Sequence, residues 1–212
     1  MSFRNNLFLL IYFPVLLIAT TLYFIGEHGD TVLWANSWHN PVSDFLFKWI
    51  TYLGDGFFFA IVTLGMLIRN WKTGLLLLSM GIMQSIVSFF LKRVVFKNQP
   101  RPRIYFEHFA DINLDFVEGV KVHAYNSFPS GHTLTAFALA TFMALYLGNK
   151  WLSLTFLLIA CLTGFSRIYL AQHFLIDICM GSLLGVMIGL AFHEWHLKFQ
   201  AHGASGINDT QN

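Results

Sequence analysis

Two side chains late in the sequence have the types and spacing of a nucleophile and its orienting group. His173 and Asp177 are four residues apart, so they lie on one face of a helix. The carboxylate can then accept a hydrogen bond from one imidazole nitrogen and leave the other nitrogen free to attack. Asp177 stands in an apolar stretch, where a carboxylate is costly without a partner. The pair predicts a catalytic site, and metal ligation by the same side chains is the alternative.

A second group, Pro129-Ser130-Gly131-His132, stands where a helix is expected to begin. The first turn of a helix has unpaired N–H groups and the positive end of the dipole. Ser130 is a suitable N-cap, and Gly131 lets an anion approach the backbone closely. This arrangement predicts an anion cradle with His132 beside it. The alternative is an ordinary helix cap followed by an incidental histidine.

Positive side chains gather before this helix and again close to His173. Arginine binds phosphate oxygens with two parallel N–H groups, and lysine acts as a point charge, so together they can neutralise a phosphate dianion. Anchoring to anionic lipid headgroups is the alternative interpretation. Such an excess of cations also argues against a bound metal. The side chains concerned are Lys92, Arg93, Lys97, Arg101, Arg103 and Arg167.

The composition predicts the setting of these groups. Of the 212 residues 56% are hydrophobic, 17% are aromatic and only 11% are charged, which does not suit a water-soluble globule. Cys161 and Cys179 both lie in apolar stretches and are expected to be buried thiols. The apolar run that starts at Leu7 has no small-residue cleavage site after it, so we expect a retained first membrane span.

We therefore expect an all-α polytopic membrane protein with six transmembrane helices and an interfacial helix between the first two. A helix needs about 20 apolar residues to cross a bilayer. The interfacial part is expected to begin at Pro41, and the fifth span to extend to Tyr169. We expect one domain over residues 1–199 and a disordered polar tail over 200–212. The expected spans are 7–25, 52–68, 73–95, 130–147, 151–165 and 174–192.

The distribution of charge predicts the orientation of these spans. Lysine and arginine are commonest in cytoplasmic loops, and here they favour the side that holds both termini. The basic loop after the third span then lies on the outer side, against the rule, which calls for a function such as anion binding. Residues 92–102, 129–132 and 166–177 all meet at this outer side. The protein is thus expected in the cell (inner) membrane with its site on the periplasmic or extracellular face.

These segments resemble the signature of the type 2 phosphatidic acid phosphatase family. Pro129–His132 matches its Pro-Ser-Gly-His part, and Ser166–Asp177 matches its Ser-Arg-x5-His-x3-Asp part. In the first part, Lys-x6-Arg-Pro, Arg101-Pro102 is present, but Val94 stands where the lysine is expected. We assign the lysine to Lys92, with a loop two residues longer, and Lys97 is its competitor.

The resemblance implies a division of labour. His173 would attack phosphorus and form a phosphohistidine, Asp177 would orient it, and His132 would protonate the leaving oxygen. The phosphoryl oxygens would be held without metal or cofactor by Lys92, Arg101, Ser130, Gly131 and Arg167.

The implied substrate is a membrane lipid phosphate or diphosphate, such as phosphatidic acid, phosphatidylglycerol phosphate, a polyprenyl diphosphate or lipid A. No nucleic acid partner is expected, and the sequence predicts no oligomeric state. Two other functions stay open. One is transfer of the phosphate to a second lipid by the same residues. The other is a non-catalytic lipid-phosphate binder or transporter, which would need no oriented nucleophile.

Overall fold

The chain folds into helices joined by short turns and one long loop, as seen in a computed structural model. The structure describes residues 6–110 and 112–208, with the backbone alone for 109 and 202–208, and this part contains helices and no strand. The α-helices are α1 (Leu7–Ile25), α2 (Asp30–Asn36), α3 (Pro41–Ile50), α4 (Gly56–Arg69), α5 (Trp71–Phe90), α6 (Pro102–Tyr105), α7 (Gly131–Leu147), α8 (Lys150–Tyr169) and α9 (Leu175–Asn208). A 3₁₀ turn, η2 (Thr51–Gly54), precedes α4, and π-helical turns η3 (Leu91–Val95) and η4 (Phe106–Ala110) follow α5 and α6.

Short polar side chains begin most of these helices. Asn40 accepts hydrogen bonds from the N–H groups of Val42 and Ser43, so α3 begins at Pro41 as expected. Asn149 caps α8 in the same way. These caps satisfy backbone groups that have no partner inside the helix. The local sequence therefore fixes where the helices start.

Four helices in the described part are long and apolar enough to cross a bilayer: α1, α5 with η3, α8, and the first 27 residues of α9. A fifth candidate is the pair Pro41–Gly54 and Gly56–Arg69, which is bent by 53° at Asp55. Helix α7 is apolar but has only 17 residues. Length and composition thus support four or five of the six expected spans. The expected extension of the fifth span to Tyr169 is present, because α8 ends there.

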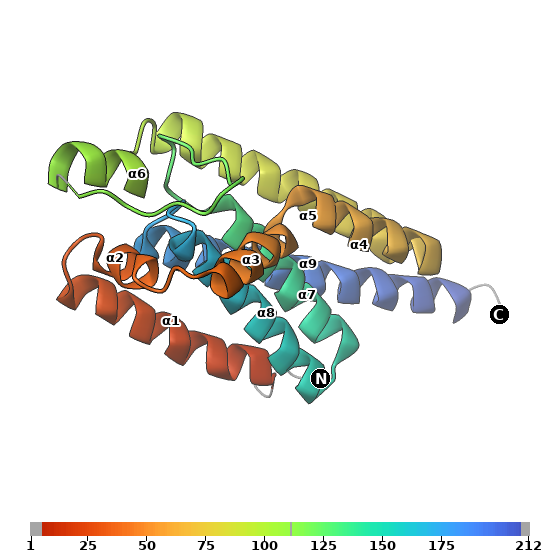
Figure 1. Cartoon of the computed structure of the whole chain (residues 1–212). Coiled ribbons are helices and arrows are strands. Elements are labelled where there is room, and N and C mark those ends of the chain that lie inside the picture. Colours follow the sequence, from red (N-terminus) through yellow and green to blue (C-terminus); the bar gives the residue numbers. More distant parts are fainter. Residues whose placement is uncertain (1–5, 111, 209–212) are drawn as a thin grey trace.

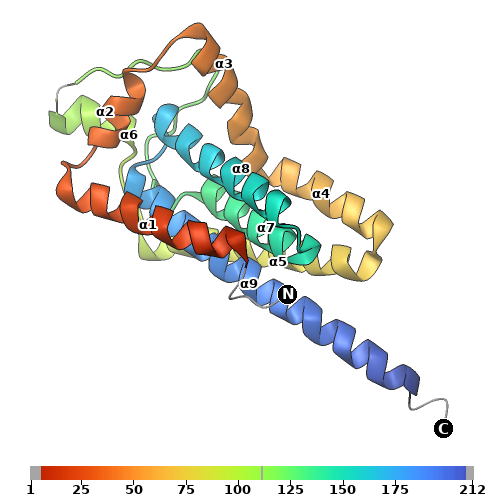
Figure 2. The ribbon, with the colours of Figure 1, turned by 90° about the horizontal axis from the view of Figure 1, so that it is seen from below.

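Helix α7 lies at the centre of the bundle, between α8 and α9 (Figures 1 and 2). One side of α7 packs with α1 and α8 around Phe137, and the other packs with α4 and α5 around Phe142. Glycines of α9 allow the close approach to α7. A Cβ on Gly181, Gly185 or Gly189 would lie only 2.5–2.7 Å from a backbone oxygen. These oxygens belong to Ser130, Leu134 and Ala138, respectively.

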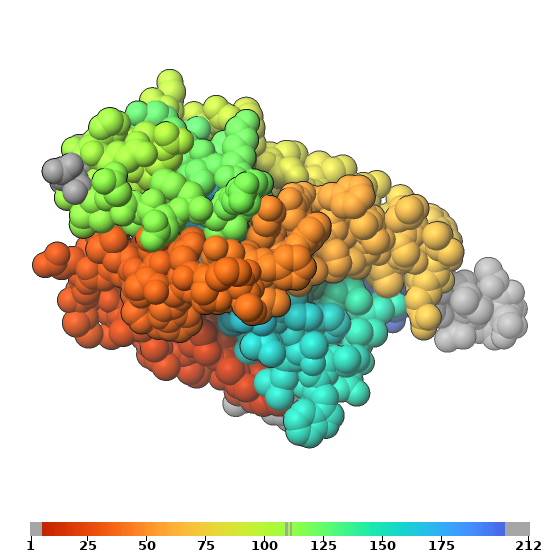
Figure 3. Space-filling model, in the orientation of Figure 1, coloured from red at the N-terminus to blue at the C-terminus, as the bar shows by residue number. Residues whose placement is uncertain are grey.

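The long loop 97–128 covers one end of the bundle, and the start of α1 and the end of α9 lie away from it (Figure 1). In Figure 3 this loop lies against the segment that contains α2 and α3. Asn36 Nδ2 donates to Asp115 O at 2.7 Å, and Lys48 Nζ donates to Glu118 O at 2.8 Å. The loop is therefore fixed to the helices beneath it by hydrogen bonds between distant parts of the sequence.

No break marks the predicted domain boundary at residue 199, since the backbone of α9 stays helical to Asn208. Residues 209–212 of the expected tail lie outside the described residues. The division into a 1–199 domain and a 200–212 tail stays a prediction.

Candidate active site

His173 and Asp177 meet at the loop end of the bundle as their spacing predicts. The turn between α8 and α9 carries His173, and Asp177 stands in the first turn of α9. His173 Nδ1 lies 3.2 Å from Asp177 Oδ2, and the two residues are 1% and 2% exposed. The same carboxylate oxygen accepts the backbone N–H of Phe174 at 3.0 Å and the hydroxyl of Ser127. Three donors hold this oxygen, so the imidazole has a fixed orientation and Nε2 is left for chemistry.

The first turn of α7 is joined to this pair through the backbone. Ser130 N donates to the carbonyl oxygen of Asp177 at 3.0 Å, and Ser130 is fully buried. The Ser130 hydroxyl caps α7 by accepting from Thr133 N at 3.4 Å, and it also accepts from the Thr133 hydroxyl at 2.8 Å. Its own hydrogen is free to donate. A Cβ on Gly131 would lie 3.3 Å from Ser88 Oγ, a tight contact, so glycine keeps the space between this backbone and Ser88 free.

Arg101 reaches the site from the long loop. Its Nη1 donates to the backbone oxygen and to the side-chain oxygen of Gln172, both at 3.0 Å, and its Nε donates to Tyr125 O at 3.0 Å. Gln172, the residue before His173, thus holds the Arg101 side chain beside that histidine. Burial lowers the pKa of Arg101 to about 10, while Asp177 acts to raise it, so the guanidinium is charged at neutral pH.

Two further cations complete the site. Arg167, 6% exposed, donates from Nη1 to Thr51 Oγ1 at 2.6 Å, whereas its buried Nε has no hydrogen-bond partner among the described residues. Lys92 Nζ donates to Asn126 O at 3.3 Å. An unpaired buried donor is expensive unless a ligand satisfies it. This Nε is therefore available to a bound anion.

The charge of these groups acts on His173. Burial, and then the positive charges of Arg101, Lys92 and Arg167, lower the pKa of His173 well below its ordinary value. A neutral imidazole has a lone pair, so it can act as a nucleophile. The same set of cations attracts a phosphate. The site thus combines a neutral imidazole with three nearby cations, which could serve as a nucleophile and as partners of an anion.

Lys92 and Lys97 differ in their surroundings. Lys92 is half-buried in η3 and points to the loop carbonyl of Asn126, whereas Lys97 is exposed. The positive charge of Lys92 contributes to the lowered pKa of His173. The structure brings together His173, Asp177, Lys92, Arg101, Arg167, Ser130 and Gly131, and leaves Lys97 outside.

His132, in the first turn of α7, lies beside Asp55 between η2 and α4, and it is close enough to His173 to contribute to the lowered pKa of that residue. Its Nε2 lies 3.8 Å from Asp55 Oδ2, and both side chains are partly exposed. Gly54 is required here, because a Cβ would lie 2.5 Å from the carbonyl oxygen of His132. This close contact sets the position of His132 relative to the bent span.

Four contacts were not predicted from the sequence: Ser127 on Asp177, Gln172 on Arg101, Thr51 on Arg167 and Asp55 near His132. The first two partners stand within two residues of Pro129 and His173, so adjacency to the motifs is a signal that could have found them. Thr51 and Asp55 carry no such signal. The described residues contain no group of three or more His, Cys, Asp or Glu that could hold a metal ion.

Comparison with known proteins assigns this site to a family. A model of the PAP2 superfamily matches residues 72–201, which is more than half of the chain and contains the whole site except Thr51, Gly54 and Asp55. The chain belongs to the PAP2 superfamily. The resemblance found in the sequence motifs is thereby confirmed.

Named relatives share parts of the chain. Lipid A 1-phosphatase from Porphyromonas gingivalis is 43% identical over 68 residues, which cover 31% of this chain and 15% of that protein. This PAP2 chain spans 15% to 37% of the length of three curated relatives, all named lipid phosphatases.

Two crystal structures resemble the PAP2 chain in fold. Aquifex aeolicus LpxE has a TM-score of 0.64 at 29% identity, covering 77% of this chain and 92% of that one. A transmembrane PAP2-type phosphatidylglycerolphosphate phosphatase from Bacillus subtilis has a TM-score of 0.65 at 24% identity, covering 90% and 94%. The all-helical membrane architecture is therefore that of the family.

Proposed function

We propose that this PAP2 protein removes phosphate from a membrane lipid phosphate or diphosphate through a phosphohistidine. The observation that carries the proposal is the buried His173–Asp177 pair, with Nδ1 at 3.2 Å from the carboxylate, beside three cations. The names of several relatives, lipid A phosphatases and lipid phosphate phosphatases, support the substrate class. A binder alone would need the cations and no oriented imidazole.

The reaction takes two displacements at phosphorus. In the first, His173 Nε2 forms a bond to phosphorus while the bond to the lipid oxygen breaks, and that oxygen takes a proton from His132. In the second, water attacks phosphorus, its proton passes to His132, and the nitrogen–phosphorus bond breaks to release phosphate. Asp177 accepts the Nδ1 hydrogen throughout, so it stabilises the positive charge that grows on the imidazole.

Positive groups and backbone amides hold the phosphoryl oxygens in both steps. Lys92, Arg101 and Arg167 surround the place where the phosphorus must stand, and the first turn of α7 adds the hydroxyl of Ser130 and the N–H of Gly131. Such preorganised donors stabilise the charge of the transition state. They supply the role that a metal ion has at other phosphoryl-transfer sites, so we propose that the reaction needs no metal.

We further propose six spans, with α4 and the turn before it as the second and the short α7 as the fourth, and α3 as the interfacial helix between the first two spans. Both termini are then cytoplasmic, and the site faces the outer side of the cell membrane. Support comes from the positions of lysine and arginine in the short loops. Single cysteines placed in residues 97–128 and near residue 149 test this orientation. Their accessibility to a membrane-impermeant thiol reagent is measured in intact cells.

The function is tested with purified protein in detergent and a panel of lipid phosphates. We expect release of inorganic phosphate, unchanged by excess chelator. Loss of activity with chelator, restored by a divalent cation, would contradict the mechanism. Labelled phosphate found on a second lipid would identify a phosphotransferase, and binding without any release would identify a binder or transporter.

A further inference from the structure

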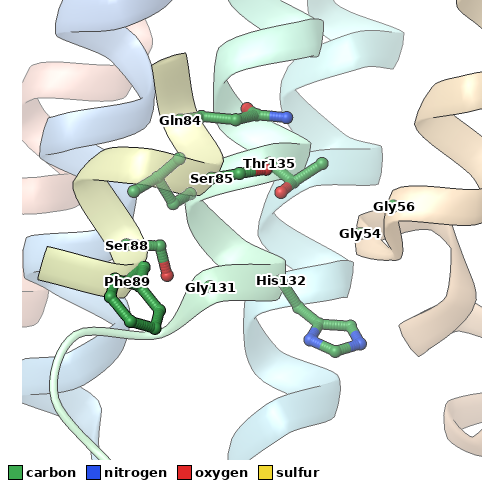
Figure 4. A pocket seen from close by; sticks show the side chains of 10 residues that line it. Gly54, Gly56, Gln84, Ser85, Ser88, Phe89, Gly131, His132 and Thr135 are labelled. Carbon is green, nitrogen blue, oxygen red and sulfur yellow. The ribbon is translucent and has the colours of Figure 1, made fainter. Parts of the chain in front are cut away.

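A cavity of about 340 Å³ lies beside His132, between α5, the first turns of α7 and the Gly54–Gly56 turn. In Figure 4 the side chains of Gln84, Thr135 and His132 reach into this space, and Ser88 lies near Gly131. The lining therefore includes an amide, hydroxyls and an imidazole, although it lies between the candidate membrane span α5 and the apolar helix α7.

Gln84 contributes a buried amide to this lining. Gln84 is 5% exposed, and its Oε1 has no hydrogen-bond partner among the described residues. A polar side chain in a membrane span is costly when it has no partner, and such a residue usually has a function. A ligand in the cavity would supply the missing partner.

The direction of α5 relates the cavity to the phosphate site. Gln84, Ser88 and Lys92 are spaced four residues apart, so they follow one another along one face of α5 and its π-helical end. Lys92 belongs to the cation group, and Ser88 Oγ lies beside the backbone of Gly131. A lipid whose phosphate lies near Lys92 would place its next atoms along Ser88 and Gln84.

We propose that this cavity binds the part of the lipid next to the scissile bond, and that it selects a glycerol or sugar with hydroxyl or amide groups. This inference rests on the proposed phosphatase function, because it places the leaving group beside His132. Gln84, Ser88 and Thr135 form hydrogen bonds with those groups, while the acyl chains lie outside in the bilayer. A volume of this size holds a glycerol or one sugar unit and no complete lipid.

The proposal separates two classes of substrate. A phosphorylated glycerol or sugar headgroup has donors and acceptors within a few bonds of phosphorus. A polyprenyl diphosphate has its second phosphate next to the scissile bond and then only hydrocarbon, and an ionised phosphate accepts hydrogen bonds without donating them, so Gln84 Oε1 would stay without a donor. A site with buried polar groups rejects a substrate that cannot pair with them. The protein should therefore prefer the glycerol or sugar phosphate.

The experiment measures kcat/KM for phosphatidylglycerol phosphate and for undecaprenyl diphosphate, and compares their ratio among variants. Gln84→Leu keeps the approximate volume and removes the amide, and Ser88→Ala and Ser85→Ala remove hydroxyls of the lining. Ser79→Ala is the matched control for Ser85→Ala. Both serines are exposed on α5 and donate to the carbonyl four residues earlier, at 2.9 and 2.8 Å, and Ser79 is outside this cavity.

We expect the wild-type ratio to favour phosphatidylglycerol phosphate and to fall about tenfold in Gln84→Leu, the effect of one lost hydrogen bond of about 1.4 kcal/mol. Ser88→Ala and Ser85→Ala should lower it less, and Ser79→Ala should keep the wild-type ratio. The inference would be overturned if both Gln84→Leu and Ser88→Ala kept the wild-type ratio. It would also be overturned if the wild-type protein preferred undecaprenyl diphosphate. If Gln84→Leu does not fold, Ser88→Ala decides alone. No phosphate release from any lipid would instead refute the proposed function.

Discussion

The helices α7 and α9 are joined in two different ways along their length. At the loop end Ser130 N donates to the carbonyl of Asp177, and polar groups from the loop close over the pair. Further along, glycines of α9 face the backbone of α7, and a Cβ on Gly185 would lie 2.5 Å from Leu134 O. The first region fixes atoms for chemistry, and the second fixes the distance between two helices.

The difference has an energetic reason. In a bilayer, the apolar side chains of two helices gain little by leaving lipid for each other, so helices associate through close packing and small residues. Such packing is independent of charge. Buried polar groups at the loop end must instead be paired with one another or with a ligand. Changes in the two regions should therefore differ in kind, turnover in one and stability in the other.

The largest effect is expected at the nucleophile. His173→Ala removes the group that bonds to phosphorus, so turnover should fall at least about four orders of magnitude on every lipid substrate. Asp177→Asn should lower turnover on every substrate by misplacing the imidazole tautomer. His196→Ala, on the far part of α9, is the control histidine and should keep turnover near that of the wild type. Acid-labile phosphate trapped on the His173→Ala protein would show that the nucleophile is a different residue.

The next effect depends on the leaving group and concerns His132. A lipid alcohol is a poor leaving group without a proton, whereas a lipid diphosphate releases a phosphate whose second pKa is about 6. His132→Ala should reduce monoester hydrolysis by about two to four orders of magnitude and reduce diphosphate hydrolysis much less. Rates on both substrate types, with His173→Ala in parallel, provide the measurement. Equal losses on the two types would assign His132 another role.

A smaller effect is expected for one lysine of the loop end. Lys92→Ala removes a cation that acts on the phosphate site, so turnover should fall about a hundredfold, as for one oxyanion donor. Lys97→Ala, which removes an exposed lysine five residues away, is the matched control and should have a mild effect. Steady-state rates of the two variants on one lipid phosphate decide between them. The reverse ranking would move the role to Lys97.

Most of the site could be predicted from the sequence because its residues stand in three short segments with characteristic spacing. The pair His173 and Asp177 needs only one helix turn, and Ser130 needs only a helix start. Their partners come from elsewhere. Thr51 reaches Arg167 only because η2 packs on α8, and Ser127 reaches Asp177 only because the long loop returns over the bundle. Such contacts depend on tertiary packing, which spacing does not reveal.

The same distinction applies to the fold. The first span, 7–25, was predicted with the bounds that α1 has, since its composition changes sharply at both ends. The second expected span, 52–68, is interrupted at Asp55, which ends η2 and caps α4 by accepting from Phe57 N. Because apolar residues flank Asp55 on both sides, the sequence pattern did not reveal that it caps a helix. Hydropathy reports burial in lipid and says little about a bend.

The smallest effect on turnover, together with a clear effect on stability, is expected in the glycine-lined part of α9. Gly185→Val would place side-chain atoms against Leu134 O and Phe137, so α7 and α9 must move apart. Overpacking of this kind costs about 1–3 kcal/mol, or roughly 2–4 °C in Tm for each kcal/mol in a chain of this size. Gly65→Val in α4 is the matched control, because a Cβ there meets nothing within 4 Å. Thermal unfolding in detergent gives the Tm, and phosphate release per folded molecule gives the turnover. A fall in turnover as large as that of Lys92→Ala, without a change in Tm, would mean that this part of α9 takes part in the chemistry and that the two regions are not separate.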